Sequence, residues 1–201
     1  MKVVNSYDGL DTLAHKYKTD KGTRHYEGMT LTPKGYTVHY DNYFSLMKVN
    51  ALLEIGVGKG GSLRMWEELF PNAEIYGIDI NPKCKQHETK RTKVFIGSQA
   101  NKKFLEKFCS KITEPLDIII DDGSHVPADQ ITSFETLFPV LSPGGYYVIE
   151  DLRTHYTSNH LKKSLWFFNE IMANLHRVEN HYPIESIYLH RGIVFIKKAK
   201  Q

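Results

Sequence analysis

An apolar segment followed at once by a glycine-rich turn restricts the possible folds of this 201-residue chain more than any other feature. Residues 51–55 read Ala-Leu-Leu-Glu-Ile, and glycines stand at 56, 58, 60 and 61 before a predicted helix start at Ser62. Glycine allows positive φ and lets a ligand lie against the backbone, and the free N–H groups of a helix N-terminus follow. This order is typical of the ligand-binding turn of a Rossmann-like sheet.

The glycine spacing fits two cofactors. Gly56, Gly58 and Gly61 match the G-x-G-x-x-G of dinucleotide enzymes, whereas Glu54, Gly56, Gly58 and Gly60 match the E-x-G-x-G-x-G of S-adenosylmethionine enzymes. A plain glycine turn between a strand and a helix is a third interpretation. The rest of the chain must decide among them.

Apolar strands alternate with amphipathic helices from residue 50 onward. The predicted strands are 51–55, 74–80, 93–96, 116–121 and 146–150, the predicted helices are 63–70, 83–89, 102–110, 129–141 and 161–176, and a hairpin joins 186–190 to 193–197. Such repeats imply parallel strands with right-handed crossovers. We therefore predict an α/β fold, a doubly wound, Rossmann-like, mostly parallel sheet with a C-terminal antiparallel hairpin.

The first 47 residues precede this sheet. Apolar and aromatic residues at helical spacing predict helices over 8–17 and 36–47. We expect residues 1–47 to form a helical lid segment and residues 48–201 to form the main domain, within one globular unit.

Composition excludes several classes of protein. The net charge is +3 and the 26 Lys and Arg residues are scattered, so no nucleic-acid partner is expected. The two cysteines are not in C-x-x-C spacing and support neither a disulfide framework nor a zinc site. Nothing resembles a leader or a membrane span, so we expect a cytoplasmic protein with a small-molecule substrate and no membrane partner, and a homo-oligomer stays open.

Polar residues follow the second and third predicted strands. Asp79 fits an acid that binds ribose hydroxyls, and the polar groups at Ser98 and Gln99 suit the edge of an adenine. Because ligands of open parallel sheets bind beyond the carboxyl ends of the strands, these side chains are candidates for cofactor binding.

Acidic residues follow the fourth and fifth strands. Asp122, Glu150 and Asp151 would meet at one place, since neighbouring strands lie about 4.8 Å apart. Ionised carboxylates cannot crowd together without a counter-cation, and oxygen ligands favour Mg²⁺, Mn²⁺ or Ca²⁺. The alternative is that these acids cap helices, which we favour for Asp121. His125, three residues after Asp122, is the candidate general base.

Charge separates the two cofactors. A dinucleotide pyrophosphate is an anion and would sit poorly among these acids, whereas the cationic sulfonium and ammonium of S-adenosylmethionine suit Glu54 and the nearby carboxylates. A dehydrogenase also usually needs a second substrate domain, for which this length leaves no room. The sequence therefore favours S-adenosylmethionine.

These motifs resemble those of metal-dependent sugar O-methyltransferases of the macrolide-tailoring (mycinamicin/macrocin) type. The resemblance rests on the glycine motif that begins at Glu54, on Asp79, on Asp122-Gly-Ser-His125 and Glu150-Asp151, and on the leader Tyr17-Lys18-Thr19-Asp20-Lys21-Gly22. It implies a class I methyltransferase fold, Mg²⁺ on Asp122, Glu150 and Asp151, and catalysis by His125 and Asp122. The expected donor-binding residues are Tyr17, Thr19, Lys21, Glu54, Gly56, Gly58, Gly60, Ser62, Asp79, Ile80, Ser98, Gln99 and Asp122.

The function that follows is methyl transfer from S-adenosylmethionine to a hydroxyl of a sugar or glycosylated small molecule, assisted by a divalent metal. One alternative is a catechol-type or other small-molecule O-methyltransferase, which needs the same acids. Others are a hydroxylase or oxidoreductase on a related fold and a binding module that keeps the fold without turnover. Fold analogy alone does not choose among them.

Overall fold

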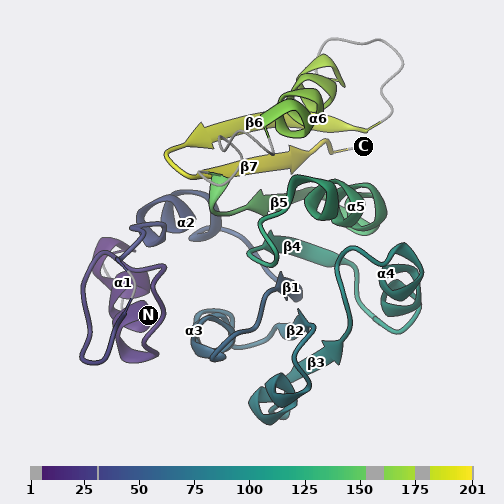
Figure 1. Ribbon diagram of the computed structural model, residues 1–201. Helices are drawn as coiled ribbons and strands as arrows, with labels where there is room; N and C mark the ends of the chain where they lie inside the picture. Colours follow the sequence, from purple (N-terminus) through teal and green to yellow (C-terminus); the bar gives the residue numbers. More distant parts are fainter. Residues whose placement is uncertain (1–5, 31, 153–160, 175–181, 201) are drawn as a thin grey trace.

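The computed structural model describes residues 6–30, 32–152, 161–174 and 182–200, and a seven-stranded sheet forms its centre (Figure 1). The strands are β1 (Ala51–Ile55), β2 (Glu74–Asp79), β3 (Thr92–Ile96), β4 (Leu116–Asp121), β5 (Leu141–Ile149), β6 (Ile184–His190) and β7 (Ile193–Lys198). Their order is β3-β2-β1-β4-β5-β7-β6, with β1 to β5 parallel and β7 antiparallel to both of its neighbours. The predicted fold class is confirmed.

Helices connect the strands. They are α1 (Ser6–Lys16), α2 (Thr37–Phe44), α3 (Gly61–Leu69), α4 (Lys102–Cys109), α5 (Pro127–Leu137) and α6 (Leu161–Asn174), with 3₁₀ helices η1 (Pro82–His87) and η2 (Phe138–Val140). Local chemistry explains several starts: the Asn101 side chain accepts the Phe104 N–H, and Gly60, at φ +73°, turns the chain into α3.

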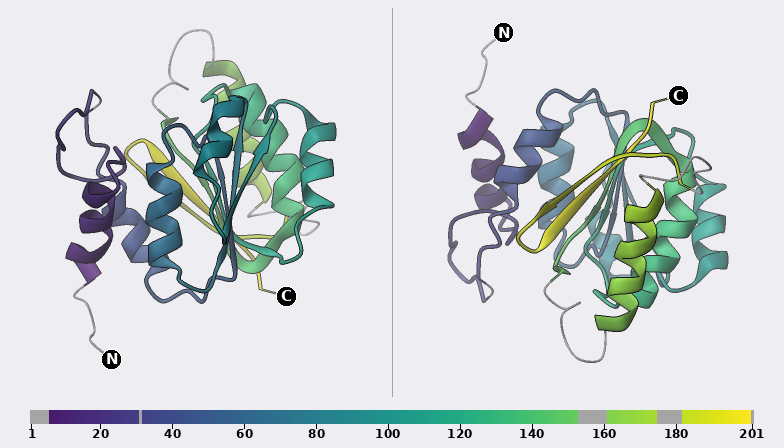
Figure 2. Two further views of the ribbon diagram at one scale, coloured as in Figure 1. Left: turned by 90° about the horizontal axis from the view of Figure 1, so that it is seen from below. Right: turned by 90° about the horizontal axis from the view of Figure 1, so that it is seen from above.

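Alternate side chains of the strands fill two hydrophobic cores, one on each face of the sheet. Leu52 and Ile120 pack with Trp66 under α1, α2 and α3, whereas Leu53 packs with Phe134 under α4, α5 and α6. Figures 1 and 2 show these two layers of helices on opposite sides of the twisted sheet. Strands buried on both faces explain the continuous apolar runs in the sequence.

Several predicted boundaries differ from the structure by one to five residues, and two of the differences have a clear local cause. The helix expected over 129–141 runs from Pro127 to Leu137, because Pro139 lacks an N–H and the chain continues as η2. β5 begins at Leu141, so Gly144, at φ +78°, lies inside an irregular part of the strand and not in a turn before it. The last two residues of the helix expected over 161–176 lie outside the described residues.

The N-terminal segment folds back on itself beside the sheet. The backbone N–H groups of residues 34, 35 and 37 donate to the carbonyl oxygens of residues 20, 22 and 21 at 2.8, 2.9 and 3.0 Å. This pairing places Lys21 and Lys34 on neighbouring, hydrogen-bonded segments of the backbone. Helix α1 also packs on α2 and α3. Two lysines that are distant in sequence therefore approach the sheet together.

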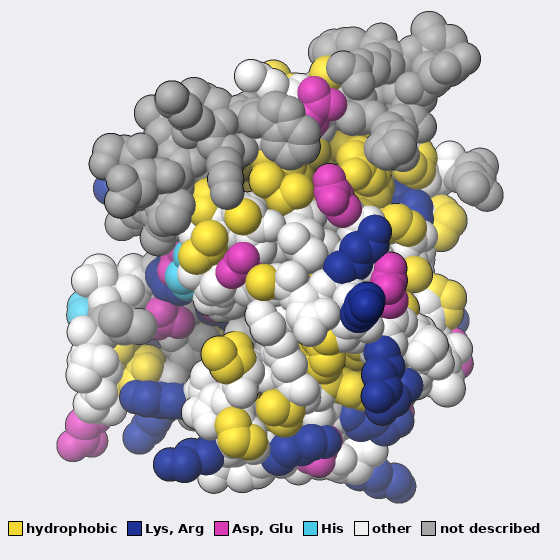
Figure 3. Space-filling model, turned by 45° about the vertical axis from the view of Figure 1, so that its right-hand side comes forward, with side chains coloured by type: hydrophobic (Ala, Val, Ile, Leu, Met, Phe, Trp, Pro, Cys, Tyr) yellow, Lys and Arg dark blue, Asp and Glu magenta, His cyan; other side chains and the backbone are white. Residues whose placement is uncertain are grey.

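Charges are mixed on the face shown in Figure 3, where Lys and Arg side chains lie among acidic and hydrophobic ones. Within the described part of the chain, no helix combines the length and the apolar character that crossing a bilayer requires.

Candidate active site

The crevice where the strand order reverses, between β1 and β4, gathers residues from three strand ends. Gly56, Asp122 and Glu150 immediately follow β1, β4 and β5, which are neighbours in the sheet. The backbones approach so closely that a Cβ on Gly56 would lie 2.1 Å from the carbonyl oxygen of Asp122. Only glycine fits there, and its φ of +93° gives a second reason.

Lys21 is buried at the centre of three carboxylates. Its Nζ lies 2.6 Å from Asp122 Oδ2, 2.6 Å from Glu150 Oε1 and 3.2 Å from Glu54 Oε1. The hydroxyl of Tyr40 also donates to Glu150 Oε1. A lysine therefore supplies part of the counter-charge that crowded carboxylates need.

These charges shift one another's ionisation. Burial and the neighbouring Asp122 carboxylate raise the pKa of Glu150 to about 8, against the opposite pull of Lys21. Burial also raises the pKa of Glu54. Burial acts in the same direction on Asp122, but the Lys21 and Lys34 ammonium groups outweigh it and hold its pKa below the ordinary value.

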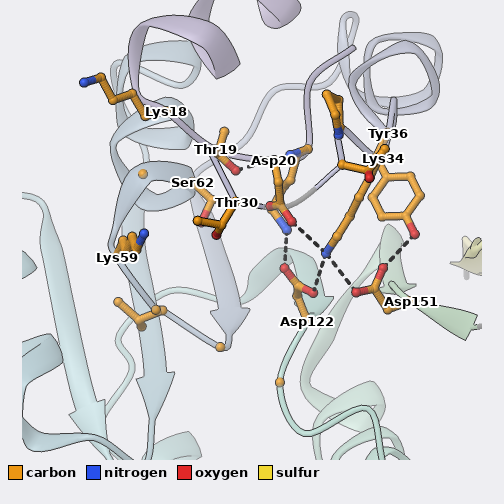
Figure 4. Close-up of a pocket in the computed structure, with 18 of the residues that line it drawn as sticks. Lys18, Thr19, Asp20, Thr30, Lys34, Tyr36, Lys59, Ser62, Asp122 and Asp151 are labelled. Carbon is orange, nitrogen blue, oxygen red and sulfur yellow. Dashed lines mark hydrogen bonds and ion pairs between the residues drawn. The ribbon is translucent and has the colours of Figure 1, made fainter. Parts of the chain in front are cut away.

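A second cluster lies nearer the solvent, around Lys34 (Figure 4). Lys34 Nζ is 2.9 Å from Asp151 Oδ2, 3.3 Å from Asp20 Oδ2 and 3.6 Å from Asp122 Oδ1. His125 Nε2 lies 3.6 Å from Asp151 Oδ2 and 3.9 Å from Asp122 Oδ1. Asp122, His125 and Asp151 offer ligand atoms that all lie within 4.8 Å of one another, as a metal site requires.

The backbone is strained at this site. Lys18, His125 and Asp151 are the non-glycine residues at positive φ within the described part of the chain, each at +55°. Residues other than glycine rarely adopt positive φ. Those that do cluster at active sites, where the surrounding structure holds them in this conformation. All three line the same cavity.

That cavity has a volume of about 770 Å³ and joins the glycine turn to the acidic cluster. One wall comes from the N-terminal segment between residues 18 and 36, and the opposite wall comes from residues 56–62 and the end of β2. Of the predicted donor-binding residues, it contains Thr19, Lys21, Gly56, Gly58, Ser62, Asp79 and Asp122. Its size suits a cofactor.

The remaining predicted donor-binding residues, Tyr17, Glu54, Gly60, Ile80, Ser98 and Gln99, lie outside the lining of this cavity. Glu54 is fully buried and accepts the Trp66 indole N–H at 3.2 Å. Gln99 bridges two strand ends, because its Nε2 donates to Asp121 at 3.0 Å and its Oε1 accepts the Ser124 N–H at 2.6 Å. Both side chains support the crevice from behind.

Asp79 holds the glycine turn in place. Its Oδ2 accepts the N–H groups of Val57 and Gly58 at 2.9 and 3.0 Å, and its Oδ1 accepts that of Asn81 at 2.8 Å. Burial alone would raise the pKa of Asp79, but these backbone hydrogen bonds outweigh it and lower the pKa. The carboxylate is thus fixed, ionised, at the cavity wall.

Known proteins share this fold and about a third or more of this sequence where they match it. The family described as "Methyltransferase domain" matches residues 53–152. The solved structure of MycE methyltransferase from the mycinamycin biosynthetic pathway, in complex with Mg, SAH and mycinamycin VI, superposes with a TM-score of 0.83 at 32% identity, over 96% of this chain and 55% of that one. The chain belongs to the class I methyltransferases.

Two curated relatives of this chain are named as O-methyltransferases. The 8-demethyl-8-alpha-L-rhamnosyl tetracenomycin-C 2'-O-methyltransferase of Streptomyces olivaceus is 33% identical over 94% of this chain. Mycinamicin VI 2''-O-methyltransferase of Micromonospora griseorubida is 41% identical over 73% of it. This chain spans 54% of the first relative's length and 37% of the second's.

Three residues of the site are not predicted from the sequence: Lys34, Tyr36 and Tyr40. The Tyr36 hydroxyl donates to Asp151 Oδ1 at 2.9 Å, while Tyr40 reaches Glu150. The four-residue spacing of the tyrosines, which puts both on one face of a helix, was a usable signal. Lys34 gave none, because its place depends on the backbone pairing with residue 20.

Proposed function

We propose that this protein transfers a methyl group from S-adenosylmethionine to a hydroxyl of a sugar or glycosylated small molecule, with the help of a divalent metal. The observation that carries the proposal is the single cavity that joins the glycine turn to the cluster of Asp122, His125 and Asp151. The named activities of the relatives and the Mg and SAH in the MycE structure support the same assignment.

The donor would lie along the glycine turn. Gly56 and Gly58 leave room for it against the backbone, and Asp79 stands at the end of β2 to receive its ribose hydroxyls. The N-terminal segment, with Thr19 and Lys21, would cover the donor from the opposite side as a lid. This geometry would exclude water from the reacting methyl group.

The acids fit a hard divalent cation. Asp122 and Asp151 would hold it, and Glu150 is our third ligand because, among the described residues, none donates a hydrogen bond to its buried Oε2. Bound by these residues, such a cation would supply Lewis acidity, which lowers the pKa of an acceptor hydroxyl.

Asp122→Asn should weaken Mn²⁺ binding by at least about tenfold, because a neutral amide is a poorer ligand and the site loses a charge. Calorimetric titration with Mn²⁺ measures it. Asp117→Asn, which removes a carboxylate at the opposite end of β4, is the control and should bind Mn²⁺ like the unaltered protein. Equal affinity of Asp122→Asn and Asp117→Asn would contradict the metal assignment.

His125 is left to act as the base, since Mg²⁺ prefers oxygen ligands. Its imidazole would take the proton of the acceptor hydroxyl as the O–CH₃ bond forms and the S–CH₃ bond breaks, leaving S-adenosylhomocysteine. The cavity would hold the hydroxyl and the methyl group in line, and such positioning would supply much of the rate.

His125→Ala is therefore expected to lower the turnover number by about 10²–10⁴ while donor affinity stays nearly unchanged. Steady-state methyl transfer and calorimetric titration of S-adenosylhomocysteine measure the two quantities. His15→Ala, on the exposed side of α1, is the matched control and should keep full turnover. Undiminished turnover in His125→Ala would show that another group removes the proton.

The proposal as a whole is tested by titrating S-adenosylhomocysteine and, separately, NAD into the protein with and without Mg²⁺. Binding of S-adenosylhomocysteine and not of NAD is the expected result, and binding of NAD alone would return the glycine turn to its dinucleotide interpretation. Methyl transfer to sugar diols and to catechols, compared side by side, then separates the proposed acceptor from the catechol-type alternative.

A further inference from the structure

A cation of the protein itself lies at the candidate metal site. Lys34 Nζ lies between the carboxylates of Asp122 and Asp151, at 3.6 and 2.9 Å, and these carboxylates belong to the candidate metal group. A divalent cation cannot take both carboxylates while an ammonium group stands between them, since like charges at such distances repel strongly. One of the two cations must leave.

Lys21 and Lys34 differ in how easily their ammonium groups can leave the carboxylates. The Lys21 side chain is 1% exposed and touches three carboxylates, so its removal would strand buried charges. The Lys34 side chain is 18% exposed and lines the open cavity. Its backbone N–H donates to the carbonyl oxygen of Asp20, which holds the backbone in place. The ammonium group therefore moves by rotation about the side-chain bonds.

A second acceptor for Lys34 is already in place. Asp20 Oδ2 lies 3.3 Å from Lys34 Nζ, on the side of the N-terminal segment and away from the sheet. Figure 4 shows Lys34 extended from that segment toward Asp122 and Asp151. An ammonium that moves toward Asp20 would keep a carboxylate partner while it frees the other two.

We propose that Lys34 is an exchangeable counter-ion, which fills the cation position between Asp122 and Asp151 in the metal-free enzyme and passes to Asp20 when the divalent metal binds. The inference rests on the proposed function, because it concerns the same metal site. It assigns Lys34 a role in setting metal affinity, and Asp20 a role that operates only through Lys34.

The test is calorimetric titration of Mn²⁺ into four proteins: unaltered, Lys34→Met, Asp20→Asn and the double variant. Lys34→Met should bind Mn²⁺ at least about tenfold more tightly, because the competing cation is gone. Asp20→Asn should bind several-fold more weakly, because the displaced ammonium has lost its acceptor. In the Lys34→Met background, Asp20→Asn should change the affinity by less than about twofold, the signature of coupled residues.

Lys59→Met is the matched control. Lys59 is exposed and lines the same cavity, but no ion pair joins it to the acids among the described residues. Its replacement should change Mn²⁺ affinity by less than about twofold, so a comparable gain in Lys59→Met and Lys34→Met would show a general electrostatic effect and overturn the exchange. An equal loss from Asp20→Asn in both backgrounds would overturn the role of Asp20.

Thermal unfolding gives a readout that is independent of binding heats. Metal-free Lys34→Met should melt at a lower temperature than the unaltered protein, and saturating Mn²⁺ should raise its Tm by more. Lys34→Gln repeats the experiment with a polar side chain. If the unaltered protein and Lys34→Met bind Mn²⁺ equally tightly, the metal site stands and only the exchange is wrong. If neither of them binds Mn²⁺ at millimolar concentration, the metal assignment fails and the exchange fails with it.

Discussion

Replacing Gly56 with alanine is expected to lower the free energy of unfolding by about 3 kcal/mol or more. The new Cβ would lie 2.1 Å from the carbonyl oxygen and 2.7 Å from the carbonyl carbon of Asp122, and backbone atoms that directly follow two central strands cannot move aside cheaply. The φ of +93° adds strain of its own. Urea denaturation of the metal-free protein measures the loss.

Gly58→Ala, in the same turn, is the matched control. A Cβ at this position meets no atom within 4 Å, and its φ of +53° lies in the left-handed region, so we expect a loss of only about 1 kcal/mol. Similar losses in the two variants would mean that the close approach of β1 to β4 is not what requires glycine. Because the clash falls on Asp122, Gly56→Ala should also weaken Mn²⁺ binding.

Lys21→Met is expected to destabilise the protein by about 3–5 kcal/mol, the usual result of removing one partner from a buried ionic cluster. Glu54 and Glu150 are fully buried and would lose their ammonium partner. Lys16→Met is the control, because Lys16 pairs with Glu68 at the surface, and its removal should be nearly silent. The double variant Lys21→Met/Glu150→Gln should recover part of the loss.

The loss in Lys21→Met should grow with pH. Burial raises the pKa of Glu54, and it raises the pKa of Glu150 to about 8 although Lys21 lies beside it. Removing the Lys21 ammonium should raise both pKa values further. A carboxyl group whose pKa is higher in the folded than in the unfolded protein binds more protons in the folded state. The free energy of unfolding therefore falls as the pH rises from the unfolded-state pKa through the folded-state pKa. Unfolding at pH 5 and pH 8 should show the larger deficit at pH 8, and equal deficits would contradict this account.

Most of the fold could be predicted from the sequence because its signals are local. The apolar run of residues 118–120, the glycine turn and the hairpin at residues 191–192 each indicate their structure within a few residues. The errors arose where one residue changed the outcome, as Pro139 did by ending α5 early.

The site was only partly predictable because its partners are far apart in the sequence. The strand ends located Asp122, Glu150 and Asp151, since the topology of a parallel sheet brings such ends together. Lys21 appeared in the leader motif, but nothing local indicated that it would lie buried among three carboxylates. That contact depends on how the N-terminal segment docks, and no periodicity encodes it.

The ion pairs of Lys21 also bear on how such a site can change in evolution. Lys21 binds the carboxylates of Asp122 and Glu150, 101 and 129 positions further along the chain, so these acids attach the N-terminal segment to the sheet, and Asp122 also lines the cavity. A lineage that altered Asp122 or Glu150 to adopt new chemistry would at the same time loosen the segment that forms one wall of the cavity. A change at either acid would therefore require a compensating substitution at Lys21, so we expect the three positions to co-evolve.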